Sequence, residues 1–293
     1  MTSPPDVPTS TNSRPRIDRL WPDPATDLDD EALLATYATP SVPNPSDPDA
    51  LPDLPTQPAR PWLRMNVIAS LDGAATRDGR SGGLGDAADR RVFDLLRRLA
   101  DAVIVGAGTV RDEGYGGLRL DPGAVSWREA HGLARQPTFV LVSRSLDLDP
   151  TSAVFTQAPV RPIIYTVPGA DAARWAALAE VADVVAAGSV DGVDVDPSWV
   201  RADLAGRGLV RLHSEGGPSL FGSFLAAGAV DELCLTVAPT LEAGDAGRIS
   251  HAHRPARTGM ALAAVLRADD ELFLRYVRVD KQPILCSGPS HLT

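Results

Sequence analysis

The stretch Val103-Ile-Val-Gly-Ala-Gly-Thr-Val110 begins as an apolar, β-branched run and then changes abruptly to small residues. This pattern predicts a buried strand that ends where Gly106, Gly108 and Thr109 start a short helix. Glycines let a ligand approach the backbone closely, and the free N–H groups and dipole at a helix start favour an anion. A junction of this kind is as often only a tight turn, so a phosphate site and a plain turn both remain open.

A second junction, in Val210-Arg-Leu-His-Ser-Glu-Gly-Gly-Pro-Ser-Leu220, repeats the arrangement. Its strand ends in Gly216 and Gly217, and Pro218 then opens a helix at the first position, which proline favours. Two turns suited to phosphate suggest one ligand with a diphosphate. Neither turn has the six-residue Rossmann glycine pattern, and the chain lacks a P-loop lysine because Lys281 is its only lysine. The two junctions therefore favour a dinucleotide held by some other fold.

Between these junctions, the run Phe139-Val-Leu-Val-Ser-Arg144 predicts a buried strand with Ser143 and Arg144 at its end. Ligands of open α/β sheets gather at this edge. In one interpretation, Arg144 binds the ribose 2′-phosphate of the cofactor. This contact would select NADPH over NADH, because a guanidinium binds phosphate well. The other interpretation is a solvated arginine at the start of a loop.

The remaining periodicity predicts an α/β fold from Trp62 onward. Apolar β-branched runs alternate with amphipathic helical patterns, which indicates a mostly parallel central sheet flanked by helices. After a helix at 217–227 the pattern changes to three strand-like runs, which we expect to form a C-terminal antiparallel meander. The other predicted strands are 62–69, 102–106, 138–143, 162–166, 182–186 and 209–214, the meander is 231–238, 260–268 and 271–278, and the other helices are 87–99, 170–179 and 197–206.

Three regions follow from composition: an N-terminal arm over 1–60, one domain over 61–280 and a tail over 281–293. Fourteen of the 26 prolines precede Trp62, so the arm is too rich in turn-formers to pack a core of its own. Within the arm, the pattern of residues 28–37 predicts one short helix, which we expect to dock on the domain.

Composition also excludes several classes of function. A formal charge of −10 disfavours nucleic acid and anionic membranes as partners, and no apolar run is long enough to span a membrane. The two cysteines, Cys234 and Cys286, make neither a disulfide framework nor a zinc site, which fits a reducing cytoplasm. His251 and His253 lie among arginines, and we interpret them as solvated surface side chains. We therefore predict no metal site.

The first strand of the domain leads into Asn66-Val-Ile-Ala-Ser-Leu-Asp-Gly73. Asp-Gly alone signals only a turn. In order along the chain, however, this motif is followed by Leu96-Arg97, the Gly106 junction and Glu215-Gly-Gly-Pro218, and this constellation is far more specific.

Together these motifs, from about Arg60 to Val279, resemble the reductase domain of riboflavin biosynthesis. That family comprises the C-terminal half of bifunctional deaminase-reductases and stand-alone diaminopyrimidine reductases. The resemblance implies a dihydrofolate-reductase-like fold, a homodimer and hydride transfer from NADPH to the ribosylamino carbon of a phosphoribosylaminopyrimidine, which opens the sugar to a ribityl chain. The family's zinc-deaminase signature is absent from this sequence.

The resemblance also implies the site residues. On the substrate side it implies Ser81, Arg97 and Glu215, with Arg119 as the counterpart of an arginine that helps bind the sugar phosphate. The cofactor positions, from the resemblance and the junctions together, are Ile68, Gly83, Gly106, Thr109, Glu113, Ser143, Arg144, Gly216, Gly217, Pro218, Ser219 and Leu220.

Three polar residues are candidates for a catalytic role at the reacting carbon. Glu215 either positions a hydroxyl or supplies a proton through water. Asp72 acts there or only caps its turn, and Asn66 either hydrogen-bonds the pyrimidine or is structural.

The sequence departs from the family on the substrate side. Asn66 stands where many bacterial fused enzymes carry a lysine, which excludes a lysine-based mechanism. The segment 113–119 differs from the family's motif, and Gly83 replaces a tryptophan. Reduction of a pteridine such as dihydrofolate, or NADP(H) binding without catalysis, therefore remain as alternatives.

Overall fold

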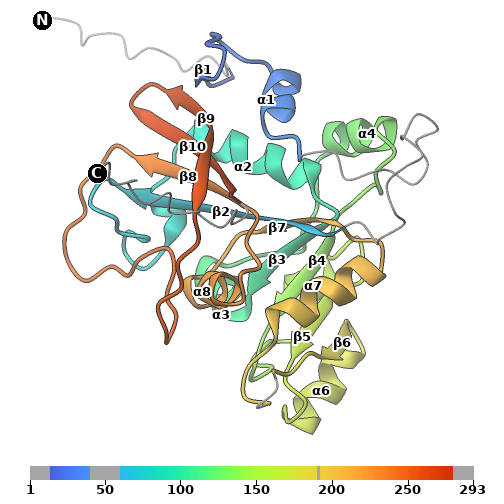
Figure 1. Cartoon of the computed structure of the whole chain (residues 1–293). Coiled ribbons are helices and arrows are strands. Elements are labelled where there is room, and N and C mark those ends of the chain that lie inside the picture. Colours follow the sequence, from blue (N-terminus) through green and yellow to red (C-terminus); the bar gives the residue numbers. More distant parts are fainter. Residues whose placement is uncertain (1–13, 40–59, 190–191, 280–293) are drawn as a thin grey trace, which may run out of the picture.

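The computed structural model describes residues 14–39, 60–189 and 192–279. Within these residues one sheet holds ten strands in the order β1-β9-β10-β8-β2-β7-β3-β4-β5-β6 (Figure 1). Their bounds are β1 Asp18–Trp21, β2 Trp62–Ser70, β3 Ala102–Gly106, β4 Thr138–Val142, β5 Ile163–Thr166, β6 Asp183–Ala186, β7 Arg211–Ser214, β8 Glu232–Ala238, β9 Met260–Ala268 and β10 Glu271–Arg278.

The sheet is parallel except at one end. From β8 through β2, β7, β3, β4 and β5 to β6, every neighbouring pair is parallel. β10 is antiparallel to both β8 and β9, and β1 is antiparallel to β9. The predicted α/β class, with a mostly parallel sheet and a terminal antiparallel meander, is confirmed.

Helices cover both faces of this sheet. Alternate residues of the central strands point to opposite faces, so Ile104 packs with α7 and α8 while its neighbours Val103 and Val105 pack with α5 and α6. The antiparallel end packs against α1 and α2 instead. The helices are α1 Asp30–Thr36, α2 Ala87–Leu99, α3 Ala107–Glu113, α4 Pro122–Ala130, α5 Ala153–Thr156, α6 Ala172–Ala179, α7 Pro197–Gly206 and α8 Pro218–Ala226, with a 3₁₀ turn η1 at Ser81–Gly83.

Helix α2 has a polar and an apolar face because its buried residues recur at helical spacing. Asp86 caps its first turn and accepts hydrogen bonds from the N–H groups of Ala88 and Asp89, at 2.6 and 3.1 Å. Arg97 and Arg98 lie in its last turn, where cations favour the helix dipole.

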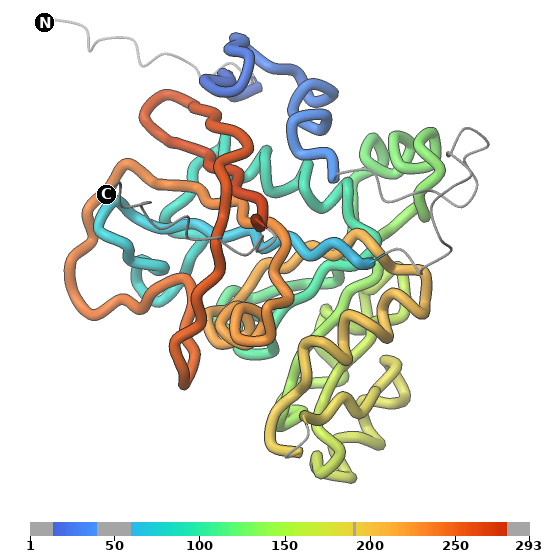
Figure 2. The backbone as a smooth tube through the Cα atoms, viewed as in Figure 1, coloured from blue at the N-terminus to red at the C-terminus, as the bar shows by residue number. Residues whose placement is uncertain are grey.

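The segment 14–39, which we call the N-terminal segment, lies against the antiparallel end of the sheet and α2 (Figure 2). The expected docking helix is present as α1, with Asp29 as its N-cap. The strand β1, which the sequence analysis did not anticipate, extends the sheet beyond β9. The rest of the predicted arm and the tail over 281–293 lie outside the described residues.

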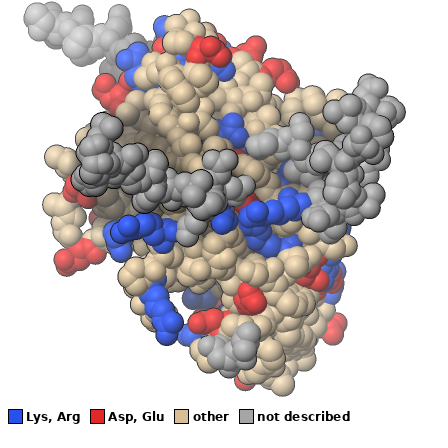
Figure 3. Space-filling model, in the orientation of Figure 1, with Lys and Arg blue, Asp and Glu red and all other residues tan. Residues whose placement is uncertain are grey.

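The described residues carry charge unevenly. Because Lys281 lies outside them and is the only lysine, the basic side chains of the face in Figure 3 are arginines, which gather along its middle.

None of the described helices has the length and apolar character that a membrane crossing requires. In the same residues, no three histidine, cysteine or acidic side chains are grouped as a metal ion would need.

One buried acid gives the fold a testable pH dependence. Burial first, and then Asp86 and Asp89, raise the pKa of Glu271 from 4.5 to about 8. The folded state keeps a proton that the unfolded state releases between about pH 4.5 and 8, so the free energy of unfolding falls as pH rises through this window. We expect Glu271→Gln to match the wild type near pH 4.5 and to exceed its stability by up to about 4 kcal/mol near pH 8.

Urea unfolding of both proteins at the two pH values measures this difference. An equal difference in stability at both pH values would contradict the shifted pKa.

Candidate active site

A cavity of about 550 Å³ opens among β2, α2, α3 and the start of α8. The loop around η1 and Ile249, from the loop after β8, complete the lining of this cavity. It brings together ten of the residues singled out from the sequence, namely Asn66, Ile68, Ser81, Arg97, Thr109, Glu113, Glu215, Gly216, Gly217 and Pro218. The other eight, Asp72, Gly83, Gly106, Arg119, Ser143, Arg144, Ser219 and Leu220, do not line it.

The two glycine junctions lie against each other on one side of this cavity. The N–H of Gly106, at the end of β3, donates to the carbonyl of Gly216, after β7, at 2.9 Å. Gly216 has a φ of +91°, and the peptide bond between Gly216 and Gly217 is cis. A Cβ on Gly217 would lie only 2.4 Å from Oγ1 of Thr109, so the close approach of the two turns leaves no room for a side chain there unless Thr109 moves.

The helix starts at these turns suit an anion. Gly106 is the N-cap of α3 and Gly217 the N-cap of α8, and neither helix has a side-chain cap. The N–H groups of both first turns are therefore left for a ligand, which fits the diphosphate of a dinucleotide.

Gly217→Ala tests this arrangement. The added methyl group would force Thr109 to turn its hydroxyl away, so we expect a dinucleotide that binds at these junctions to bind about tenfold more weakly, the value of one hydrogen bond to a charged group. Fluorescence titration with NADPH measures it. Gly206→Ala is the matched control, because a Cβ there meets nothing within 4 Å and α7 lies outside the cavity lining. Equal affinity for the two variants would rule out a role of Gly217 in cofactor binding.

Next to the second junction, Glu215, which directly precedes Gly216, forms a bidentate ion pair with Arg97 of α2. Nε and Nη2 of Arg97 donate to Oε1 and Oε2 of Glu215 at 2.5 and 2.8 Å. The hydroxyl of Tyr115 also donates to Oε2, at 2.9 Å. Burial opposes ionisation of Glu215, but the charge and hydrogen bonds of Arg97 outweigh it and lower the pKa of Glu215 to about 2. Glu215 is therefore an acceptor at neutral pH.

Aromatic rings hold Arg97 in position. Its guanidinium lies 4.3 Å from the ring centroid of Phe93 and 5.9 Å from that of Tyr115, within cation–π range. Tyr115 in turn stacks on Phe139 of β4, with centroids 6.1 Å apart. The pair between Arg97 and Glu215 is thus fixed before any ligand arrives.

His213 lies behind Glu215 without a hydrogen-bond partner on either ring nitrogen. Its Nε2 is 3.6 Å from Oε1 of Glu215, too far for a direct hydrogen bond. Burial lowers the pKa of His213, so the imidazole is neutral and contributes no full charge to this side of the cavity.

Glu113 fixes the loop that closes the cavity. Its Oε1 accepts from the backbone N–H of Ser81 at 2.6 Å and from the Ser81 hydroxyl at 2.8 Å. Glu113 ends α3 and Ser81 starts η1, so this contact joins the cofactor side of the cavity to the substrate side expected from the sequence.

Asp72 lies in its turn rather than at the cavity. Its carboxylate accepts from the Ser70 hydroxyl and from the N–H groups of Glu242 and Ala243. These hydrogen bonds, with that of Ser70 the largest, lower the pKa of Asp72 to about 2. The geometry favours the turn-capping alternative, and a catalytic role for Asp72 stays a prediction.

Two predicted arginines also point elsewhere. Arg119 is exposed and donates to the carbonyl of Gln157 at 3.2 Å. Arg144 is exposed and lies 3.4 Å from Asp194, while the buried Ser143 binds Tyr165 through its backbone N–H. Their predicted roles toward phosphate groups remain untested, and the described contacts of Arg119 and Arg144 hold neither guanidinium at the cavity wall.

Several cavity residues were missed from the sequence. Arg90, Phe93 and Asp94 lie on the same face of α2 as Arg97, so the helical spacing from Arg97 was a usable signal. Ile249 reaches the cavity from a loop far along the chain, and no local pattern marks it.

The sheet order and this cavity define an α/β protein with a mostly parallel sheet and a ligand-sized cavity among β2, α2, α3 and α8. Residues 61–272 match the model of the RibD C-terminal domain, and the chain belongs to that family. A pyrimidine reductase-like protein from Corynebacterium diphtheriae has a similar solved structure, with 30% identity, a TM-score of 0.68 and coverage of 78% of this chain and 96% of that one.

Two curated relatives are similar to this chain in sequence. The 2,5-diamino-6-ribosylamino-4(3H)-pyrimidinone 5′-phosphate reductase of Methanothermobacter thermautotrophicus is 34% identical over 187 residues, which cover 63% of this chain and 81% of that protein. The riboflavin biosynthesis protein RibD of Bacillus amyloliquefaciens is 30% identical over 185 residues, which cover 63% of this chain and 47% of that protein. The match thus spans about half of the RibD relative and most of the archaeal reductase.

Proposed function

We propose that the chain is an NADPH-dependent reductase that transfers hydride to the ribosylamino carbon of a phosphoribosylaminopyrimidine, giving the ribitylamino product. The observation that carries this proposal is one cavity that holds both the two uncapped glycine junctions and the buried ion pair of Arg97 and Glu215. The names of the archaeal and bacterial relatives support the pyrimidine substrate.

The cofactor residues follow from the junctions. A bound nicotinamide cofactor supplies the hydride. The first turns of α3 and α8, with Thr109 between them, would hold its phosphates, and Ile68 would lie against the nicotinamide side. We assign the preference for NADPH to Arg144, because its ion pair with Asp194 is exposed on both sides and costs little to exchange for a 2′-phosphate.

The substrate residues orient the sugar. The ionised Glu215 accepts a hydrogen bond from a sugar hydroxyl, and its low pKa excludes it as the proton donor at neutral pH. Arg97 keeps Glu215 in that geometry, while Ser81 and Asn66 bind polar groups of the ring or ribose. The main contribution of these side chains is to hold the reacting carbon against the hydride donor.

Reduction of a pteridine is a second candidate, because one observation favours it. Among the described residues that line the cavity, the cationic side chains are Arg90 and Arg97, against the six acids Asp86, Asp89, Asp94, Asp112, Glu113 and Glu215. Arg119 does not line the cavity. An amino-bearing heterocycle without a phosphate meets less repulsion from these carboxylates, which accept hydrogen bonds from ring amino groups.

Oxidation of NADPH by the purified protein distinguishes these functions when ribosylaminopyrimidine phosphates and dihydrofolate are offered in parallel. Turnover of a pyrimidine phosphate supports the first proposal, and turnover of dihydrofolate alone replaces it with the second. Tight NADPH binding without turnover of any substrate would support a non-catalytic binding protein.

We also propose a cytoplasmic homodimer. The exposed apolar residues Leu20, Trp21 and Leu262 at the antiparallel end of the sheet support an interface between copies. Sedimentation velocity measures the state of association, and a monomer at all accessible concentrations would overturn the dimer.

A further inference from the structure

Helix α2 lies between the cavity and the N-terminal segment. Arg90, Asp94 and Arg97 on one face line the cavity. On the opposite face, Val92, Leu95 and Leu96 are buried in one cluster with residues of the segment, including Leu28, Leu33 and Leu34. The family match begins only at residue 61, so the segment lies outside the matched domain.

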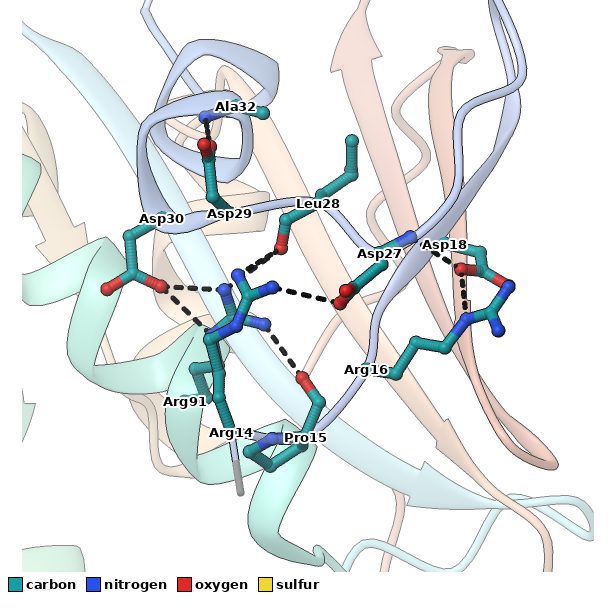
Figure 4. Close-up of polar contacts among 10 residues, drawn as sticks. All are labelled: Arg14, Pro15, Arg16, Asp18, Asp27, Leu28, Asp29, Asp30, Ala32 and Arg91. Carbon is teal, nitrogen blue, oxygen red and sulfur yellow. Dashed lines mark hydrogen bonds and ion pairs between the residues drawn. The ribbon is translucent and has the colours of Figure 1, made fainter. Parts of the chain in front are cut away.

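Arg91 is the polar link between α2 and this segment. Its Nε and Nη2 donate to one carboxylate oxygen of Asp30 at 3.0 and 2.7 Å (Figure 4). Nη1 donates to the carbonyl of Pro15 at 2.8 Å, and Nη2 also donates to the carbonyl of Leu28 at 3.0 Å. The Arg91 side chain is only 10% exposed. One guanidinium therefore holds α2 to three separate points of the segment.

We propose that Arg91 is a positioning residue, through which the N-terminal segment sets the placement of α2 and hence of the substrate side of the cavity. This inference rests on the proposed reductase function. Removing the guanidinium leaves the Pro15 carbonyl and the Asp30 carboxylate without this donor and the Leu28 carbonyl with Arg14 alone, which favours a shift of α2. Helices α3 and α8, which begin at the glycine junctions, contribute no residue to the cluster between α2 and the segment. Cofactor binding should therefore be spared.

Arg14 provides the matched control. It also donates to the carbonyl of Leu28, at 2.7 Å, and to Asp27, at 2.9 Å, but both partners lie within the segment itself. Arg14→Met thus removes a guanidinium from the segment, while the described contacts between Arg91 and the segment stay in place.

The test compares full-length Arg91→Met, Arg91→Lys and Arg14→Met with the wild type. We expect Arg91→Met to raise KM for the substrate about tenfold, because small misplacements of binding groups are costly, with kcat and the Kd for NADPH nearly unchanged. Arg91→Lys should recover part of the loss, since it keeps the charge opposite Asp30. Arg14→Met should leave KM unchanged. An equal KM in Arg91→Met and the wild type, or equal rises in both Met variants, would overturn the inference.

A second measurement separates this inference from the proposed function. If the wild type turns over none of the substrates offered, the proposed function fails, and amide hydrogen exchange of α2 then decides the role of Arg91. Faster exchange across 87–99 in Arg91→Met but not in Arg14→Met supports the positioning role. Equal exchange in the two variants overturns it.

Discussion

Replacing Glu215 by Gln is expected to lower kcat/KM about a hundredfold, which corresponds to about 2.7 kcal/mol of transition-state stabilisation. The side chain of Glu215 is 1% exposed and keeps its shape in the variant, but the charge that neutralises Arg97 is lost. A buried guanidinium without its anion is costly and moves toward other acceptors. The ionised acceptor for the sugar hydroxyl disappears at the same time. Steady-state kinetics with NADPH and the pyrimidine phosphate measures the loss.

Tyr115→Phe is the control for this change. It removes one of the hydrogen bonds to Glu215 and leaves the ion pair with Arg97 intact, so kcat/KM should fall only severalfold, the value of one hydrogen bond. Retention of near wild-type kcat/KM by Glu215→Gln would show that the carboxylate charge has no part in the reaction.

The low pKa of Glu215 also predicts the acid side of the pH profile. A carboxylate whose folded pKa lies below its ordinary value contributes stability above that value, and loses it as pH falls through the folded pKa of about 2. Glu215 should therefore stay ionised across the measurable range, and any acid limb of kcat/KM above about pH 4 must come from another group.

The fold could be predicted to the extent that its signals are local. Strands β3, β4 and β5 are apolar runs between turn-formers, and the glycine junctions mark the ends of β3 and β7. β1 was missed because its four residues, two charged and then two apolar, show no alternation and become a strand only through pairing with β9, over two hundred residues away. α4 was missed because Pro122-Gly123 resembles a turn, although Asp121 caps the helix.

The site could be predicted only where backbone geometry decides it. Each glycine junction is local, since it joins a strand end to a helix start within a few residues, but the contact between Gly217 and Thr109 joins distant parts of the chain. The direction of a long side chain is not local: Arg97 turns into the cavity toward Glu215, whereas Arg119 turns out to Gln157. Both are arginines that the resemblance places on the substrate side, and the positions of their acceptors in the fold separate them.

Glu232→Gln is expected to lower the free energy of unfolding by about 3–5 kcal/mol, the usual cost of breaking a buried ion pair on one side. Glu232 of β8 is fully buried and accepts from Arg64 at 2.9 Å, Arg275 at 2.8 Å and Trp62 at 2.6 Å. Burial alone would oppose its ionisation, but Arg64 and Arg275 together lower the pKa of Glu232. Gln keeps the shape and leaves both arginines without an anion. Denaturant unfolding followed by circular dichroism measures the change.

Glu271→Gln is the matched comparison at neutral pH, because Glu271 is also a buried glutamate of this end of the sheet but carries no charge there. The same isosteric change should therefore be nearly neutral or stabilising at Glu271 and severe at Glu232. Arg64 and Arg275 also donate to backbone carbonyls of Thr36, Tyr37 and Ala38, so the loss of Glu232 should loosen the N-terminal segment as well. Similar losses of stability in the two variants would mean that burial, rather than the paired charge, sets the cost.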